Sequence, residues 1–210
     1  MFELIILAII ALLAGIGWMI GKWLQPGIKD NIAILGTQGA GKTTLWYAII
    51  KSDKKFGATI IPEKIPETTV TINGIKRKIG QSIDIPGANT VVEREYQNLV
   101  TEKEYIIFIF DAKKILEREE ELKDVKKRLV VINDYMNESK KIQLIGSHID
   151  ELTNDSKERE KINVKIAEKL GRDFLKKLNN CKDKSINLIN LTNKGEVDYY
   201  INNVLFKKES

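Results

Sequence analysis

Cysteine, histidine and proline are scarce in this chain of 210 residues. It contains one cysteine, Cys181, one histidine, His148, and four prolines. A single cysteine excludes a disulfide-stabilised scaffold, and a single histidine leaves no histidine–cysteine cluster with the spacing of a metal site. The apolar fraction of 43% excludes intrinsic disorder, and the charged fraction of 30% excludes a protein with many membrane spans.

Positive charge is in small excess. The 34 Lys and Arg residues outnumber the 29 Asp and Glu residues, which gives a net charge of +5. Because this charge is modest and spread along the chain, it does not argue for a nucleic-acid partner. We therefore expect no nucleic-acid binding.

Charge is absent altogether from residues 4–21, which read LIILAIIALLAGIGWMIG. As a helix this run would span about 27 Å, close to the ~30 Å hydrocarbon core of a bilayer. A buried core helix is the alternative, but such a helix rarely lacks a polar face. Lys22 and Lys29 follow the run, which disfavours a signal peptide and places the C-terminal side in the cytoplasm. We predict a single-pass transmembrane anchor at residues 1–25, with the bilayer as partner and the remaining chain cytoplasmic.

Gly17 and Gly21 form a GxxxG pair within the same run. This spacing lets two membrane helices approach closely and dimerise, but glycine is also common in membrane helices for other reasons. The sequence therefore allows a homodimer without requiring one.

The rest of the chain alternates short apolar runs with longer amphipathic ones. Strands are predicted at Asn31–Leu35, 69–72, 75–85, Tyr105–Phe110, Ile142–Gly146 and Ser185–Leu191, and helices from Thr43 and at Leu116–Met136, Lys157–Leu178 and Glu196–Phe206. Asn73-Gly74 is a strong hairpin signal. Alternating strands and helices imply parallel crossovers. We therefore predict, after a linker at residues 26–30, an α/β domain at residues 31–208 with a mainly parallel six-stranded sheet and one antiparallel hairpin strand.

A phosphate-binding motif joins the first predicted strand to the first helix. Its sequence, GTQGAGKTT, fits G-x-x-x-x-G-K-[ST]. Glycines let backbone N–H groups turn toward phosphate oxygens, and the helix N-terminus adds its positive dipole end. Lys42 would contact the β- and γ-phosphates, and the Thr43 hydroxyl would ligate Mg²⁺. The predicted ligand is a nucleoside triphosphate with Mg²⁺, bound by Gly36, Thr37, Gln38, Gly39, Ala40, Gly41, Lys42, Thr43 and Thr44.

Four further segments follow in order. They are Thr68-Thr69, Asp84-Ile85-Pro86-Gly87, Ser147-His148-Ile149-Asp150 and Leu191-Thr192-Asn193-Lys194. In this order the chain resembles the Ras-like GTPases, P-loop NTPases with a three-layer α/β sandwich, over residues 30–206. The resemblance implies that Thr68 or Thr69 reaches Mg²⁺ and the γ-phosphate. On this basis Thr69, like Lys42, is predicted to be catalytic. It also implies that Asp84 binds Mg²⁺ through water, that the Gly87 amide senses the γ-phosphate, and that Ser147, His148, Asp150, Thr192 and Asn193 bind the nucleotide.

The guanine motif, normally NKxD, is present in altered form. Asp150 keeps the carboxylate that accepts from N1–H and N2–H₂ of guanine, so GTP and GDP are favoured over adenine nucleotides. His148 resembles the T-H-x-D variant of Roc domains and would stack on the base, or it is an ordinary loop residue. Ser147 replaces an Asn that normally braces the phosphate loop, which predicts modest affinity.

The residue that positions the attacking water differs from the Ras pattern. Ala88 stands directly after Gly87, where Ras-like enzymes have Gln. Gln38, however, resembles the Gln of the dynamin-type loop G-x-Q-x-A-G-K-[ST], which orients the catalytic water. Gln38 is thus either the catalytic residue in cis or a tolerated loop residue.

Two functions fit these observations. The first is a membrane-anchored GTP-binding protein, a slow GTPase whose switch loops, residues 56–72 and 86–98, change shape and recruit an unknown protein effector. The second is a GTP-loaded membrane receptor that recruits a cytosolic partner with little or no hydrolysis. The layout of one anchor and one G domain is similar to that of the β subunit of the signal recognition particle receptor.

Overall fold

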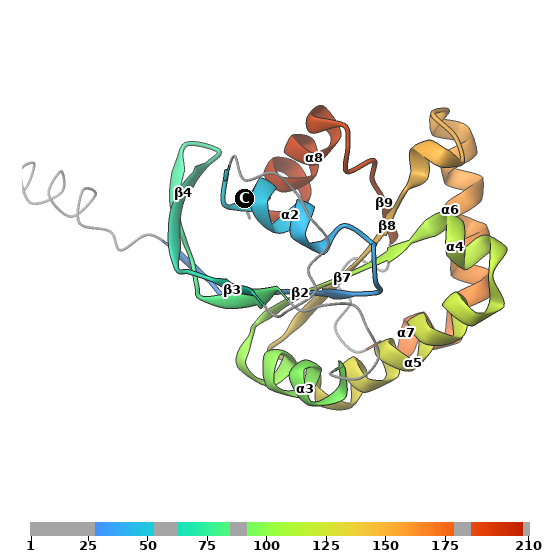
Figure 1. Cartoon of the computed structure of the whole chain (residues 1–210), viewed down its shortest axis with the longest axis horizontal. Helices are drawn as coiled ribbons and strands as arrows, with labels where there is room; N and C mark the ends of the chain where they lie inside the picture. The colour runs from blue at the N-terminus through green and yellow to red at the C-terminus, as the bar shows by residue number, and fades with distance from the viewer. Residues whose placement is uncertain (1–27, 53–62, 85–91, 179–185, 208–210) are drawn as a thin grey trace, which may run out of the picture.

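The computed structural model describes residues 28–52, 63–84, 92–178 and 186–207 (Figure 1). The predicted anchor at residues 1–25 lies outside these ranges, as does Gly87. Among the described helices, none combines the length and the apolar character needed to cross a bilayer. The anchor therefore stays a prediction from the sequence.

Strands and helices alternate along most of the chain, with four strands in succession between residues 63 and 84. In chain order they are β1 (Ile28–Asp30), β2 (Ile32–Gly36), α2 (Lys42–Ile49), β3 (Glu63–Ile65), β4 (Thr68–Ile72), β5 (Ile75–Ile79), β6 (Ser82–Asp84), α3 (Val92–Glu102), β7 (Tyr105–Asp111), α4 (Ala112–Glu117), α5 (Glu119–Tyr135), β8 (Lys141–Ser147), a 3₁₀ turn (Ile149–Glu151), α6 (Ser156–Leu170), α7 (Arg172–Lys177), β9 (Ile186–Leu188), α8 (Lys194–Tyr200) and a π-helical turn (Ile201–Leu205).

A parallel sheet of four strands forms the middle layer, in the order β2-β7-β8-β9. Helices cover both of its faces, with α2 and α8 on one side and α3 and α5 on the other (Figure 1). This arrangement confirms the predicted α/β class and the mainly parallel sheet. Parallel sheets bury both faces in this way, because their crossover connections place helices on either side.

The prediction of a single six-stranded sheet is wrong, because the ladder between the first strand and the hairpin is interrupted. The Asn31 carbonyl accepts from the Glu104 and Tyr105 N–H groups, at 3.2 and 3.0 Å, while the Gly80 N–H donates to the Asp30 carbonyl at 3.0 Å. Glycine weakens a strand interior, and the predicted strand at 75–85 divides near Gly80. Its first half, β5, pairs with β1 and β4, and its second half, β6, pairs with β3.

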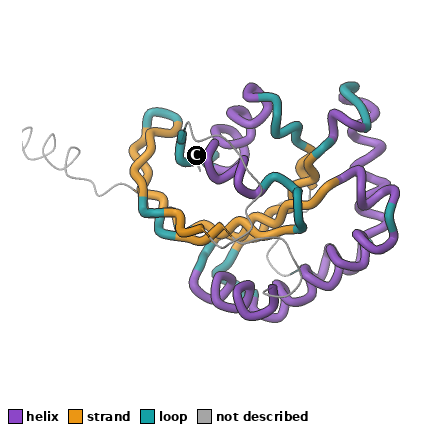
Figure 2. Tube along the Cα trace, viewed as in Figure 1, coloured by secondary structure: helices purple, strands orange, loops and turns teal. Residues whose placement is uncertain are grey.

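The hairpin between β4 and β5 is confirmed. The two strands pair antiparallel, and they turn through Asn73 and Gly74 with φ of 52° and 73°. Positive φ at both central residues is the requirement of the turn that matches strand twist. The hairpin lies at the end of the structure remote from β9 (Figure 2).

The hydrophobic core divides into two clusters, one on each face of the central sheet. Successive residues of β7 point to opposite faces, so Phe108 and Phe110 pack with α3, α4, α5 and α6, while Ile107 and Ile109 pack with α2 and α8. All four side chains are fully buried. β7 is therefore the central strand that sets the position of the carboxyl-end loops.

Two predicted helices are each broken in the structure. The segment predicted at Leu116–Met136 contains the end of α4 and all of α5, separated by Arg118, whose backbone is extended with φ of −125°. The segment predicted at Lys157–Leu178 divides at Gly171, where φ is 98°. The first break matters for the site, because it makes α4 a short helix that starts directly at the carboxyl end of β7.

Candidate functional site

The phosphate loop lies where its motif predicts, between the end of β2 and the start of α2. Gly36 and Gly41 have φ of 147° and 93°, a region that L side chains rarely adopt. A Cβ on Gly36 would lie 1.8 Å from the Ile109 carbonyl oxygen, and one on Gly41 would lie 2.4 Å from a methyl carbon of Leu191. Only glycine fits at either position, so the loop can pack tightly against β7 and the Leu191 segment.

Lys42 begins α2 and crosses back over the loop. Its ammonium donates to the Thr37 carbonyl at 2.9 Å and to the Gly36 carbonyl at 3.3 Å. Burial lowers the pKa of Lys42 from 10.5 to about 8, with the nearby Asp84 opposing this effect and Arg128 adding to it. A bound phosphate would favour the charged form. The arrangement is that of a cation held ready for an anionic ligand.

The two groups predicted to hold Mg²⁺, Thr43 directly and Asp84 through water, are in contact. The Thr43 hydroxyl donates to the Asp84 carboxylate at 2.5 Å, and Asp84 is fully buried at the end of β6. A hydroxyl and a carboxylate are hard oxygen donors, which Mg²⁺ takes together with substrate phosphates and water. The residues therefore fit this ion. Within the described residues there is no cluster of three His, Cys, Asp or Glu side chains that could hold a different metal.

The two predicted switch threonines are the first two residues of β4. Thr68 pairs with Ile79, and Thr69 pairs with Lys78, across the hairpin. The Thr68 hydroxyl donates to the Pro66 carbonyl at 3.1 Å, and Thr69 is exposed. The structure thus places both in a paired strand, and their assignment to Mg²⁺ stays a prediction.

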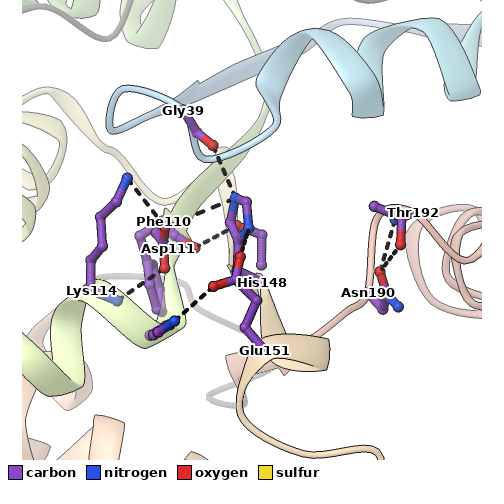
Figure 3. Close-up of polar contacts among 10 residues, drawn as sticks. Gly39, Phe110, Asp111, Lys114, His148, Glu151, Asn190 and Thr192 are labelled. Carbon is purple, nitrogen blue, oxygen red and sulfur yellow. Dashed lines mark hydrogen bonds and ion pairs between the residues drawn. The ribbon is translucent and has the colours of Figure 1, made fainter.

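The altered guanine motif follows β8. The Ser147 hydroxyl donates to the Phe110 carbonyl at 3.1 Å, inside the sheet edge. His148 has a left-handed backbone with φ of 55°, and its Nε2 lies 3.1 Å from the Gly39 carbonyl while its Nδ1 lies 3.2 Å from Glu151 (Figure 3). Asp150 is exposed in the 3₁₀ turn. His148 therefore contacts the phosphate loop, whereas the Ser147 hydroxyl is bonded to β7.

The last predicted base-contacting loop carries its own hydrogen bonds. The Thr192 hydroxyl and N–H both donate to the Asn190 side chain, at 2.7 and 2.9 Å (Figure 3). The Asn193 side chain caps α8 by accepting from the Gly195 N–H at 3.0 Å. The loop is thus hydrogen-bonded within itself, and Asn193 has a structural use besides any contact with a base.

The remaining residues of the phosphate-binding motif lie in the phosphate loop or at the start of α2. Ala40 and Thr37 are buried, Thr44 is half-buried in α2, and Gln38 is exposed in the turn of the loop. Gln38 is therefore available to a solvent water or a ligand.

Five side chains of this region are absent from the sequence prediction. They are Tyr96, Asp111, Lys114, Arg128 and Glu151. Asp111 caps α4 by accepting from the Lys114 N–H at 3.0 Å, and it pairs with the Lys114 ammonium at 3.2 Å. Lys114 in turn points toward the phosphate loop (Figure 3). The position of Asp111, directly after the predicted strand Tyr105–Phe110, is the one signal in the sequence that could have indicated a role here.

Comparisons with known proteins agree with this geometry. Residues 31–134 match the family described as 50S ribosome-binding GTPase. A crystal structure of a mutation variant of SsGBP is similar, with a TM-score of 0.50 and 15% sequence identity, over 82% of this chain and 53% of that chain. This chain spans about half the length of that protein, and the likeness concerns the fold. A comparison with curated proteins finds no match.

The family match and the phosphate-loop geometry together support a GTPase domain of the P-loop class. The match covers the phosphate loop and Asp84 and ends before Ser147. A domain of this class implies GTP or GDP binding, usually together with Mg²⁺.

Proposed function

We propose that this chain is a membrane-anchored GTP-binding protein that works as a nucleotide-dependent switch and hydrolyses GTP slowly. The observation that carries the proposal is the arrangement at the end of β2, where Lys42 crosses the phosphate loop and Thr43 meets Asp84. Lys42 would hold the β- and γ-phosphates, and bound Mg²⁺ would neutralise part of their charge.

Nucleotide binding is tested by replacing one lysine of α2 and, as a matched control, the lysine that follows the same helix. Lys42→Ala should weaken GDP binding by about a hundredfold or more, because a buried charge contact to phosphate is lost. Lys51→Ala should bind GDP like the wild type, since Lys51 is exposed and donates to the Thr71 carbonyl. Calorimetry of the two variants that shows equal losses would contradict the proposed site.

Guanine selectivity is proposed to come from Asp150. Its carboxylate is exposed beside His148 and can accept from two donors that guanine has and adenine lacks. Asp150→Ala should reduce the preference for GTP over ATP by about tenfold or more. Asp134→Ala, an exposed carboxylate at the end of α5, is the control that should leave the preference unchanged.

Slow hydrolysis is proposed to depend on Gln38. This side chain is exposed at the loop, and the position after Gly87 is Ala88, which cannot orient water. Gln38→Ala should slow phosphate release in a single turnover by about tenfold while GDP affinity stays the same. An unchanged rate would remove Gln38 from the mechanism.

The second candidate, a GTP-loaded membrane receptor that recruits a cytosolic partner, is favoured by the same Ala88. It differs from the first in one measurable way. If the wild type binds GTP but releases no phosphate above the uncatalysed rate, the receptor function replaces the switch. In either case we propose that the partner, an unidentified protein, binds at the switch loops.

The membrane anchor is proposed from residues 4–21 and is tested by its removal. The full chain should sediment with membranes and resist extraction by alkaline carbonate, and a chain without residues 1–25 should be found in the supernatant. A full chain that carbonate releases would contradict a transmembrane anchor.

A further inference from the structure

The edge of β2 at Gly36 is covered by a tyrosine side chain. The Gly36 N–H donates to the Tyr96 hydroxyl oxygen at 2.9 Å, and the same hydroxyl donates to the Gly36 carbonyl at 3.2 Å. Tyr96 belongs to α3 and is 1% exposed. On the opposite edge, β2 pairs with β7. A helix side chain therefore takes the place of a neighbouring strand at the first residue of the phosphate loop.

The Tyr96 hydroxyl is fully used. A phenolic hydroxyl has one proton to donate and two lone pairs that accept. The second lone pair accepts from Arg128 Nη1 at 3.3 Å. Arg128 lies on α5, is 2% exposed, and donates through Nε to Asp124 at 2.8 Å. Because a buried arginine needs such partners, α5 holds the tyrosine hydroxyl in one place.

The same Gly36 carbonyl also receives the phosphate-binding lysine. Lys42 Nζ donates to it at 3.3 Å, so the carbonyl oxygen lies between the ammonium and the tyrosine hydroxyl. The Tyr96 hydroxyl orients this carbonyl, and the carbonyl is in turn one of the two backbone acceptors of Lys42. A continuous series of buried contacts thus runs from Arg128 through Tyr96 and Gly36 to Lys42.

We propose that Tyr96 is a positioning residue, which orients Lys42 toward phosphate through Gly36. This deepens the proposed function and rests on it. The helix that carries Tyr96 begins at Val92, five residues after the switch glycine Gly87. Any displacement of α3 by a partner therefore withdraws the hydroxyl from the phosphate loop. The affinity for the β-phosphate becomes dependent on the position of α3.

The test removes a single hydroxyl from each of two buried tyrosines. Tyr200 of α8 is 2% exposed and donates to the Gln143 side chain at 2.5 Å, within the cluster on the other face of the sheet. Both variants keep the ring and lose one hydroxyl. Tyr96→Phe removes the bonds to the Gly36 N–H, the Gly36 carbonyl and Arg128, and Tyr200→Phe removes the bond to Gln143. The affinities of the full chain for GDP and for GMP are measured by competition with a fluorescent guanine nucleotide.

GMP lacks the β-phosphate that Lys42 contacts, so the ratio of the two affinities reports on this lysine and cancels a general loss of stability. We expect Tyr96→Phe to lower the GDP-to-GMP affinity ratio about tenfold. Tyr200→Phe should leave the ratio within about twofold of the wild type. An unchanged ratio in Tyr96→Phe, or an equal change in both variants, overturns the inference.

A second measurement needs no variant. Hydrogen exchange at the Gly36 amide of the wild-type chain should be slow, because its N–H is bonded to a buried hydroxyl. Fast exchange there overturns the inference even if Tyr96→Phe does not fold. If the wild type binds GDP but the affinity ratio of Tyr96→Phe is unchanged or the Gly36 amide exchanges fast, only the role of Tyr96 is overturned. If the wild type binds no GDP, the proposed function and the inference are overturned together.

Discussion

Replacing Lys42 by methionine is expected to stabilise the nucleotide-free protein while it removes phosphate binding. Lys42 is 7% exposed, and burial lowers its pKa from 10.5 to about 8. Methionine keeps an unbranched apolar side chain and carries no charge to bury. The lysine would thus be a residue whose function opposes stability, as binding sites often require.

The size of the effect follows from two opposing terms. The difference between 10.5 and about 8 corresponds to about 3 kcal/mol, at about 1.4 kcal/mol per pH unit. At pH 7 the side chain is charged in both states, so this free energy opposes folding in full. The hydrogen bonds to the Gly36 and Thr37 carbonyls offset about 1–2 kcal/mol of it. Lys42→Met should therefore raise the free energy of unfolding by about 1–2 kcal/mol at pH 7.

The pH dependence gives an independent check on the cause. Between pH 8 and 10.5 the unfolded chain binds more protons at Lys42 than the folded chain does, so the stability of the wild type rises with pH across this window. Lys42→Met lacks this gain. Its advantage over the wild type should therefore shrink as the pH is raised from 7 toward 10.

Urea unfolding of the nucleotide-free chain, followed by tryptophan fluorescence, measures these differences, since Trp46 is fully buried in α2. Lys140→Met is the matched control, because Lys140 is also 7% exposed, has a pKa lowered by burial, and donates to the Thr101 and Lys103 carbonyls far from the loop. It should leave GDP binding intact. A Lys42→Met protein that is less stable than the wild type at pH 7 would refute the reasoning.

Three further predictions concern contacts around the loops. Glu196→Gln should lower the free energy of unfolding in urea by about 1 kcal/mol at pH 7, because Arg159 holds Glu196 through two bonds of 2.8 and 2.9 Å. Since Arg159 lowers the pKa of Glu196 below 4.5, the wild type should lose this difference as the pH falls below 4.5, and an unchanged difference at pH 3 would contradict the pairing. His148→Ala should speed GDP dissociation about threefold or more in stopped flow, because the contact with the Gly39 carbonyl is lost, and an unchanged rate would show that this contact is not a brace. Lys114→Ala should weaken a GTP analogue about threefold in calorimetry with little change in melting temperature, since its ammonium lies at the loop and its side chain is one third exposed where it pairs with Asp111; equal affinities would exclude it from the site.

The contiguous part of the site could be predicted from the sequence alone. Residues 36–44 contain the glycines, the lysine and the hydroxyl in one short segment. The residues on either side have the apolar pattern that predicts the flanking strand and helix. The contact of Thr43 with Asp84 joins residues 41 positions apart. The resemblance to Ras-like proteins predicts a Mg²⁺ role for each of the two, and their direct contact is seen only in the structure. A contiguous motif needs no knowledge of the tertiary structure.

The contacts that hold the loop from outside could not be predicted. Tyr96 is one aromatic residue on an amphipathic helix, where an ordinary core position is the expected role. Arg128 lies within a helix rich in Lys and Glu, and its sequence neighbours give no sign that it is buried. Both are recognised only when α3, α5 and β2 are placed together. His148 likewise meets Gly39 across 109 residues.

The interruption of the sheet also escaped prediction, for a physical reason. Ile75, Ile79 and Ile83 would lie on one face of a single extended segment, so the sequence predicts one strand. Pairing, however, depends on where backbone groups find partners, and Asn31 bonds instead to the start of β7. Residue periodicity reports which face a side chain takes, and it carries no information on which neighbouring backbone continues the ladder.

The pairing of β1 with β5 has a consequence for how the domain would sit on a membrane. The three residues of β1 are in register with Arg77, Lys78 and Ile79, and Arg77 donates to both carboxylate oxygens of Asp30, at 3.0 and 3.1 Å. Between β1 and the proposed anchor lie only residues 26 and 27, at most about 7 Å of extended chain. A domain attached in this way has little freedom to rotate or to move away from the bilayer. The geometry of one short strand would thus decide which surface of the protein faces the lipid and which faces its partners.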